Sequence, residues 1–415
     1  MTAPFPQFRK IPVPFLGASL GLSAPREARL PALYGAPENA GEIISGHRPL
    51  VVGNGAVGGA IALHMARLQP AALFLTDPKS FKEESILTQP IDPVSIGKPK
   101  AAEIGRRCKA ISPNTEVHVF CGSIQELDLA ELAGTTALFL ATDNIAAEVE
   151  ASQIALRLGI PVIHAAVHGA TTVAQVRVFD IGREPDSPCP ACLLNAEEIT
   201  QMNEQATFPC DPGSVTAASA RDVQTAPTVS LPNLCSLAAD LAVMQFLKLA
   251  LPFGTPVGNT MLEFCGHTGK SWLTPTGRNP NCSCDHLAWQ IRASSRPNLA
   301  DATLGDLVRD FVVDPGSGAT FQIAAFDWLD RTACPTGHHE SPVRRFVPEL
   351  QPIEFPPCPE CQAPVTSPPL ARRNAVFSES LGNAIDTPLR ELGINSNPPW
   401  IRFDFADRTA LLLSA

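Results

Sequence analysis

The sequence lacks an uninterrupted apolar run long enough to cross a membrane. A spanning helix needs about 20 consecutive apolar residues, and the most apolar long stretch, residues 231–251, is broken by Asp240 and Lys248. The first 15 residues contain four prolines, where a signal peptide needs an unbroken apolar helix. We therefore expect a cytoplasmic protein with no membrane segment.

An excess of positive charge is also missing. The 31 Lys and Arg residues are outnumbered by 41 Asp and Glu, which gives a formal net charge of −10. This balance argues against a general nucleic-acid-binding protein and favours small molecules or proteins as partners. The 415 residues, of which 45% are hydrophobic, are enough for one large α/β domain and a smaller one.

Strands alternate with helices through the first half of the chain. The apolar patterns predict strands at 50–52, 71–76, 116–120, 137–141 and 161–167, helices at 56–68 and 146–158, and a further helix opened by a capping box at 123–126. This alternation predicts a Rossmann-like, mostly parallel sheet flanked by helices. A strand with one polar face at 172–179 and an amphipathic helix at 231–251 follow.

The flanking segments differ in composition. Residues 1–46 hold seven of the 41 prolines and show no strong apolar period, so we expect an irregular N-terminal arm before an α/β domain at 47–286. Within that domain, residues 183–229 are polar and rich in Pro, Ser and Thr. They indicate a long crossover loop that carries function.

Residues 287–415 are predicted to form a small C-terminal module. Thr387 and Pro388 make a good helix start, which predicts a helix at 388–392. Near the end of the chain, Ile401 and Phe403 alternate with polar residues, which predicts a terminal strand or hairpin.

A glycine pattern lies between the first predicted strand and the first predicted helix. Gly53, Gly55 and Gly58 have the spacing G-x-G-x-x-G, which lets the backbone approach a phosphate at a helix N-terminus. Asp77 follows the second strand, where a carboxylate can accept hydrogen bonds from ribose hydroxyls. These features alone fit NAD as well as ATP.

Two charged residues favour ATP. Lys100 can neutralise the α- and β-phosphates, and Asp143, after the fourth strand, can hold Mg²⁺ against them. A nicotinamide oxidoreductase has no use for these charges. Taken singly, Lys100 could be a solvated loop lysine and Asp143 a helix N-cap. Their joint occurrence in sheet order favours adenylation chemistry.

Twelve cysteines, several in close pairs, indicate metal ligands, a reactive thiol and core residues in a reducing compartment. Cys189 and Cys192 form a C-x-x-C, and Cys282 and Cys284 form a C-x-C about ninety residues later. Four thiolates can close a tetrahedral structural zinc site that joins the two ends of the crossover region.

A second zinc site, shaped as a ribbon, is indicated in the C-terminal module. Its ligands would be Cys334, either His338 or His339, and the C-x-x-C pair Cys358 and Cys361. Chelation would stabilise a proline-rich module that we expect to be too poor in apolar residues to hold itself.

The chain resembles the E1-like superfamily, which comprises ThiF- and MoeB-type adenylyltransferases and ubiquitin-activating enzymes. The resemblance runs from about residue 49 to residue 284 and is carried, in order, by GNGAVG, Asp77, Gln89, GKPKA, ATDN, CPAC and RNPNCSC. It implies that a ubiquitin-like protein's C-terminal glycine carboxylate attacks the α-phosphate of MgATP, which gives an acyl adenylate and pyrophosphate. It also implies a homodimer and a nucleotide site formed by Gly53, Gly55, Gly58, Asp77, Gln89, Lys100 and Asp143.

Cys210, on the polar loop, matches by position the cysteine with which E1-like enzymes form a thioester or persulfide. The alternative is an exposed thiol without a role. The C-terminal segments TPLRELGI and NPPW would suit an E2-like carrier, by analogy with bacterial ubiquitin-like conjugation operons linked to phage defence. Sulfur-carrier activation is the nearest alternative function.

The sequence departs from the family pattern at three places. Thr88 stands where the family has its phosphate-binding arginine and Ser85 where it has asparagine, so we hypothesise that Lys79 or Lys82 supplies the charge. The N-terminal segment that delivers an arginine to the neighbouring subunit is absent, although Arg26 or Arg29 could serve. The second zinc pair lacks the family's C-x-x-C, so His286 could replace one sulfur. Thr88 also leaves open a noncatalytic scaffold.

Overall fold

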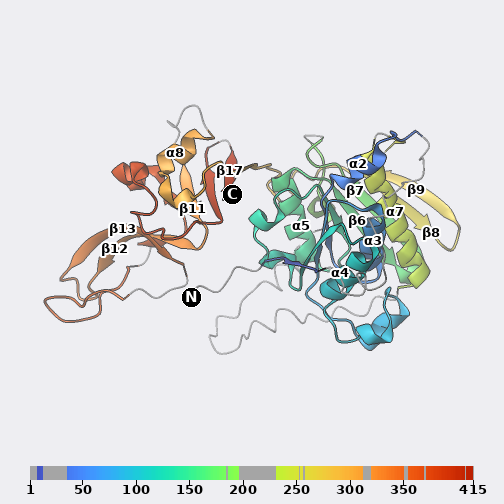
Figure 1. Cartoon of the computed structure of the whole chain (residues 1–415), viewed down its shortest axis with the longest axis horizontal. Coiled ribbons are helices and arrows are strands. Elements are labelled where there is room, and N and C mark those ends of the chain that lie inside the picture. Colours follow the sequence, from blue (N-terminus) through green and yellow to red (C-terminus); the bar gives the residue numbers. More distant parts are fainter. Residues whose placement is uncertain are drawn as a thin grey trace. The chain divides into compact units, whose positions relative to one another are not determined.

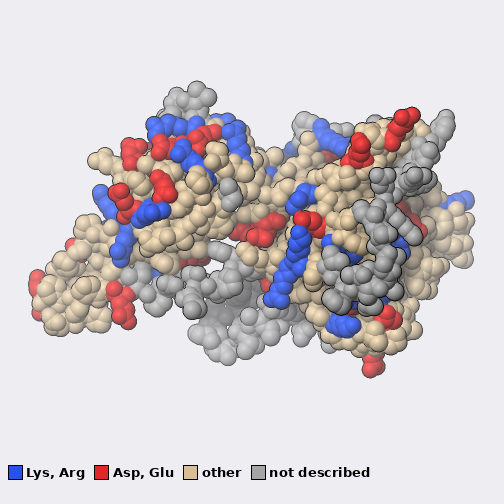
Figure 2. Space-filling model, in the orientation of Figure 1, with Lys and Arg blue, Asp and Glu red and all other residues tan. Residues whose placement is uncertain are grey.

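The computed structural model (Figure 1) describes residues 7–12, 35–183, 186–195, 230–251, 253–255, 258–311, 319–349, 354–368, 371–406 and 408–414. The chain forms two compact units, Phe5–His286 and Leu287–Ala415. On the face drawn in Figure 2, basic and acidic side chains are interspersed. Each unit has its own sheet and its own core.

The first unit is built on one nine-stranded sheet with the order β1-β4-β3-β2-β5-β6-β7-β8-β9. The strands are β1 (Arg9–Lys10), β2 (Pro49–Val52), β3 (Ala72–Thr76), β4 (Glu116–Phe120), β5 (Ala137–Leu140), β6 (Val162–His168), β7 (Val173–Phe179), β8 (Thr260–Cys265) and β9 (Lys270–Pro275). Strands β4, β3, β2, β5 and β6 are parallel. Strand β1 at one edge and β7 to β9 at the other run antiparallel to their neighbours, so the predicted parallel α/β sheet forms the centre of a larger mixed sheet.

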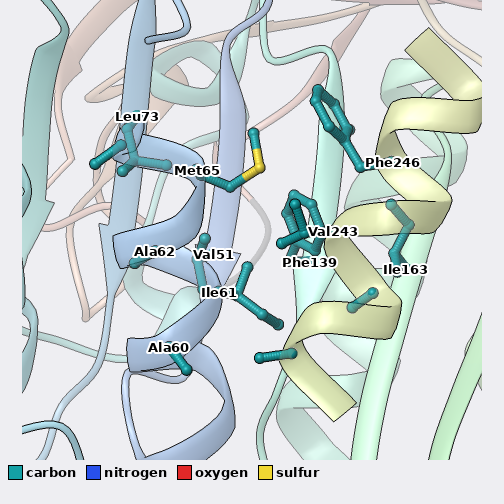
Figure 3. Close-up of a cluster of buried hydrophobic side chains, with 14 of the residues drawn as sticks. Val51, Ala60, Ile61, Ala62, Met65, Leu73, Phe139, Ile163, Val243 and Phe246 are labelled. Atoms are coloured by element: carbon teal, nitrogen blue, oxygen red, sulfur yellow. The ribbon is translucent and has the colours of Figure 1, made fainter. Parts of the chain in front are cut away.

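Helices cover both faces of this sheet. They are α2 (Ala40–Ser45), α3 (Ala56–Leu68), α4 (Lys100–Ile111), α5 (Ile145–Leu158) and α7 (Pro232–Ala250). Successive residues of β2 point to opposite faces: Val51 belongs to the core cluster under α3 and α7, and Leu50 to the cluster under α5. In Figure 3, Met65 of α3 lies close to Phe246 of α7, and both side chains are buried.

Helix α7 is long and apolar enough to cross a membrane by length and composition alone, but 56% of its most apolar window is buried within the protein. It packs against α3, β6 and β7. Cys235 on this helix is a buried core residue.

The strand order places two chain segments together at the centre of the sheet. Strand β2 lies between β3 and β5. The connection after β2 leads to β3 on one side, whereas the connection after β5 leads to β6 on the other. Ligands of open α/β sheets bind at such a switch point, outside the carboxyl ends of the strands. The glycine segment follows β2 and the ATDN segment follows β5, so both lie at this point.

The predicted elements are largely confirmed, but four local predictions are wrong. The segment predicted as an irregular arm contains β1 and α2. The predicted polar face of β7 is covered, because Gln175 is buried and donates to Glu263 of β8. Residues 124–126 form only a 3₁₀ turn: the Ser123 hydroxyl contacts the Gln125 side chain and makes no cap bond to the backbone.

The second unit contains an eight-stranded sheet with the order β10-β17-β16-β11-β12-β13, to which β14 and β15 add by pairing with β12 and β11. Its elements are β10 (Gln290–Ala293), α8 (Leu304–Arg309), β11 (Thr320–Ile323), β12 (Phe326–Ala333), β13 (Glu340–Pro348), β14 (Arg372–Arg373), β15 (Val376–Phe377), α9 (Ser378–Leu381), β16 (Trp400–Asp404) and β17 (Thr409–Leu413). Strands β16 and β17 form the predicted terminal hairpin.

The fourth wrong prediction is the helix at 388–392, which is a turn. The Leu392 amide donates to the Pro388 carbonyl as in a helix, but the next two amides turn back to the carbonyls of Arg390 and Leu389, and Gly393 has a φ of +104°. The chain therefore ends the helical turn as soon as it has formed. The unit is also richer in apolar packing than we expected. Phe321, Trp328, Phe403 and Leu389 belong to a hydrophobic cluster of its own, so metal binding is not needed to hold the whole module.

Candidate functional site

The glycine segment lies against the end of β5 with almost no free space. Gly53 has a φ of +84°, and a Cβ there would lie 2.5 Å from the Ala141 carbonyl oxygen. A Cβ on Gly58 would lie 1.8 Å from the Gly53 carbonyl oxygen, whereas a Cβ on Gly55 would meet nothing within 4 Å. Two glycines are therefore required by backbone packing, and Gly55 faces open space of the kind that a phosphate needs.

Substitutions at two glycines separate these roles. Gly58→Ala is expected to lower the free energy of unfolding by about 1–3 kcal/mol, because the methyl group overpacks the loop. Gly55→Ala is expected to leave thermal unfolding unchanged and to weaken ATP binding, because the methyl group occupies the open space. Thermal denaturation and titration calorimetry of the two variants check this, and equal loss of stability in both would contradict the assignment.

Asp77 fastens the glycine segment to the segment after β3. Its carboxylate accepts hydrogen bonds from two backbone N–H groups, that of Asn54 at 2.6 Å and that of Lys79 at 2.8 Å. Burial raises the pKa of this carboxyl, and the Lys100 ammonium opposes that shift. The carboxylate retains lone pairs for further donors, so the predicted contact with ribose hydroxyls is compatible with this arrangement.

A cluster of opposite charges lies at the same edge of the sheet. Lys100 is the first residue of α4, and its amide donates to the Lys79 carbonyl. Burial lowers the pKa of the Lys100 ammonium, while Asp77 and Asp143 oppose this shift and Lys79 and Lys82 add to it. The Lys79 ammonium lies 3.8 Å from a carboxylate oxygen of Asp143. Residues from two connections, β3 to α4 and β5 to α5, therefore bring ammonium and carboxylate groups together at the switch point.

The N-cap of α5 is Asn144 and not Asp143. The Asn144 side chain accepts from the Ala147 amide at 3.0 Å. The alternative explanation of Asp143 as a helix cap therefore fails. The alternative explanation of Lys100 as a loop lysine fails as well, since Lys100 begins a helix that sequence analysis missed.

The segment between β3 and α4 gives Ser85 a structural role. Ser85 is buried and its hydroxyl accepts from the Lys82 amide, so it closes a 3₁₀ turn (Glu83–Leu87) that Thr88 ends. The Gln89 side-chain oxygen is buried without a hydrogen-bond partner among the described residues. No sequence motif predicts this turn.

The buried carboxylate of Glu103 binds side chains at the end of the segment between β3 and α4. Glu103 on α4 is 3% exposed and accepts from Arg106, Arg107 and Ser95. The bond to Arg106 is the main cause that lowers the pKa of Glu103 to about 2. Arg107 also bonds Asp92 and the Pro90 carbonyl, so the network fixes the connection on which the lysines lie. This network was not predicted, although the spacing E-x-x-R-R places both arginines within reach of the carboxylate on a helix.

Four soft donors meet at the end of the first unit. Cys189, Cys192, Cys282 and His286 each offer one ligand atom, and these atoms lie within 4.8 Å of one another. The Cys189 sulfur lies 3.8 Å from that of Cys192, 3.7 Å from that of Cys282 and 3.6 Å from His286 Nε2. A disulfide needs about 2.05 Å, whereas two sulfurs held at about 2.3 Å by a tetrahedral zinc lie about 3.8 Å apart.

The structure places His286, rather than the predicted Cys284, in this group. Cys284 is buried, and its sulfur lies 3.9 Å from the Val149 carbonyl oxygen. His286 has a φ of +56°, which turns the chain after the C-x-C. Contact with Cys189 and burial raise the pKa of Cys192, so a cation that binds here must displace protons.

A second group of soft donors lies in the C-terminal unit. It consists of Cys334, His338, Cys358 and Cys361, again with ligand atoms within 4.8 Å of one another. His339, the other histidine considered above, contacts the Ser341 hydroxyl instead. The geometry therefore selects His338.

Three residues considered above lie outside the described residues: Cys210, Arg26 and Arg29. The same holds for most of the crossover loop, of which residues 183 and 186–195 are described. Within the described part, the first cysteine pair lies at a 3₁₀ turn (Pro190–Leu193), which Cys189 precedes and which contains Cys192.

A family model described as "ThiF family" matches residues 28–286, which is more than half of the chain. The chain belongs to the ThiF family. The ThiF match ends at His286, which is also the last residue of the first compact unit and a member of the first donor group. The C-terminal unit and its donor group lie outside the ThiF match.

A curated relative and several solved structures are similar to this ThiF-family chain. The "SAMP-activating enzyme E1" of Haloferax volcanii is 24% identical over 160 residues, or 38% of this chain. The chain spans 57% of that relative's length. A crystal structure of E. coli MccB with ATP matches 59% of this chain and 68% of its own at 16% identity and a TM-score of 0.45. PaaA matches 57% of this chain and 75% of its own at 19% identity and a TM-score of 0.42.

Proposed function

We propose that this ThiF-family protein adenylates the C-terminal glycine of a ubiquitin-like or sulfur-carrier protein at the expense of MgATP. One observation carries the proposal: the open space at Gly55 lies at the same sheet edge as the Lys79, Lys100 and Asp143 charges. Family membership and the name of the Haloferax relative support it.

The chemistry follows from the charges at this edge. The glycine carboxylate attacks the α-phosphorus of ATP, the bond to the β-phosphate oxygen breaks, and pyrophosphate leaves. The Lys100 ammonium would neutralise charge on the phosphates, and the backbone around Gly53, Gly55 and Gly58 would cradle them. Asp77 would bind the ribose, and Gln89 would offer its buried, unpartnered side-chain oxygen to the nucleotide or to the carrier.

Metal ions belong to the same proposal. Asp143 would hold Mg²⁺ against the phosphates, where the ion would spread the charge that develops on the leaving pyrophosphate. Zn²⁺ would occupy the Cys189, Cys192, Cys282 and His286 group, whose three sulfurs and one imidazole fit a closed structural site.

The steps after adenylation rest on the resemblance to E1-like enzymes. The Cys210 thiolate would attack the acyl adenylate, form a thioester and release AMP, and an E2-like protein would then accept the acyl group. We place this chemistry in the cytoplasm, in a homodimer, and in a ubiquitin-like conjugation system for antiviral defence. The alternative is a sulfur-carrier adenylyltransferase in which Cys210 forms a persulfide.

Lys79 is the better candidate to replace the missing phosphate-binding arginine, because its ammonium lies 3.8 Å from Asp143. Lys79→Ala is expected to weaken ATP binding by about tenfold, the effect of losing about 1.4 kcal/mol, while Lys82→Ala has a smaller effect. Calorimetric titration with a nonhydrolysable ATP analogue and Mg²⁺ measures both. If neither variant binds more weakly than wild type, no lysine of this segment compensates for the arginine.

Intact-protein mass spectrometry tests the thioester. Wild type and Cys210→Ala are incubated with MgATP and a candidate ubiquitin-like protein, with and without a thiol reductant. The proposal expects a thiol-labile adduct in wild type alone. Adenylate formation without an adduct would favour sulfur-carrier activation, and no ATP-dependent product with any carrier would favour a noncatalytic scaffold.

A further inference from the structure

The distal part of the β12–β13 hairpin and the segment that packs on it have almost no apolar core. No residue between positions 335 and 345 is buried, and in the described segment 354–368 only Cys358 is buried. On the hairpin, Cys334, which directly follows β12, is buried as well. A two-stranded hairpin is marginally stable without packing, yet here the buried side chains are thiols.

These thiols lie on two similar turns. In the first, the Cys334 amide donates to the His339 carbonyl and the Gly337 amide donates to the Cys334 carbonyl, with Gly337 at a φ of +80°. In the second, the backbone N–H of Gln362 donates to the Cys358 carbonyl, and the backbone N–H of Cys358 donates to the Ala363 carbonyl. Gln362 has a φ of +59°. Each turn bends the backbone tightly around its cysteine.

We infer that Cys334, His338, Cys358 and Cys361 form a second structural Zn²⁺ site that clips the hairpin to the segment 354–368. Three sulfurs and one imidazole are the donors that a closed tetrahedral zinc site takes. The Cys334 and Cys361 sulfurs lie 3.4 Å apart, which is too far for a disulfide. A disulfide would also leave the third thiol and the imidazole unused.

The Zn²⁺ site would add to the hydrogen bonds that already join the hairpin and the segment 354–368. The Ala333 and Thr366 backbones form an antiparallel bridge with bonds of 2.9 and 3.1 Å. Figure 1 shows β12 and β13 extending away from the part of the unit that holds α8, where the hydrophobic cluster lies. The metal would therefore stabilise this extension alone, and its loss would leave the rest of the unit folded.

Metal counting on the full-length chain tests the site. Elemental analysis of wild type is expected to find one Zn²⁺ for each donor group, two per chain. Cys358→Ser combined with Cys361→Ser is expected to retain one, and so is Cys189→Ser combined with Cys192→Ser. A single Zn²⁺ in wild type that the Cys358 and Cys361 substitutions leave in place would overturn the inference, as would a disulfide-linked mass in the purified chain.

The neighbouring histidines give a matched pair that does not depend on removing a thiol. His338→Ala is expected to speed loss of one Zn²⁺ to a chelator and to raise proteolytic cleavage within 335–368 by about tenfold or more, because local opening becomes easier. His339→Ala is expected to match wild type in both. Equal behaviour of the two variants would contradict the assigned ligand set. Both readouts are independent of adenylation, so failure of the proposed function would leave this inference standing.

Discussion

Lys100→Ala and Asp143→Asn are each expected to lower the rate of ATP–pyrophosphate exchange by about 10²–10³-fold, the usual cost of removing one preorganised charge from a site where charge develops. Lys100 would face the phosphates from the first turn of α4, and Asp143 would hold Mg²⁺ from the end of β5. Exchange of labelled pyrophosphate into ATP in the presence of the carrier measures both variants.

Matched controls separate this loss from a loss of folding. Lys248→Ala and Asp240→Asn change the same residue types on α7, where Asp240 pairs with His64, and both are expected to exchange at the wild-type rate. Thermal unfolding of each variant is measured as well. The Lys100 ammonium partly offsets the rise in the pKa of the buried Asp77 carboxyl, so its loss could also affect folding. Undiminished exchange in a folded Asp143→Asn protein would contradict the metal-binding role of that carboxylate.

Cys282→Ser is expected to remove one Zn²⁺ from the chain and to lower the free energy of unfolding of the first unit by about 4–5 kcal/mol, a size typical of losing a bound metal. The donors join the turn after β7 to the chain that follows β9, so their release frees both ends of the crossover region. Elemental analysis and denaturant unfolding measure the two effects.

Cys284→Ser is the control for that substitution. Cys284 lies two residues away, is also buried, and is not a member of the donor group. Its substitution is expected to leave the Zn²⁺ content unchanged. The opposite outcome, in which Cys284→Ser loses the metal and His286→Ala retains it, would restore the four-cysteine set that the spacing alone predicts.

The sequence predicted which segments meet at the carboxyl edge of the sheet because the signals for them are local. Alternating strands and helices fix the order of the connections, and Gly53 and Gly58 mark turns that have no room for a side chain. Helix α4 was not predicted, for a physical reason. Gly105 lies where a Cβ would approach Val119 to 2.5 Å, so a small residue interrupts the apolar period of the buried helical face.

Other features depend on contacts that spacing does not encode. Every residue of β9 is exposed and every residue of β8 is partly exposed, so neither strand shows a buried alternation. The C-x-C-x-H sequence brings three donors close to the site, and only the backbone turn at His286 decides which of them face it. Tight packing in the C-terminal unit likewise comes from residues scattered over 299–412.

ATP–pyrophosphate exchange with wild-type protein is the decisive measurement of adenylation. The full chain is incubated with MgATP, labelled pyrophosphate and candidate ubiquitin-like or sulfur-carrier proteins, each with a matched control that lacks its C-terminal glycine. Exchange is expected to require both Mg²⁺ and the terminal glycine. Absence of exchange with every carrier, in a protein that is folded and binds ATP, would contradict adenylation and leave a nucleotide-binding scaffold.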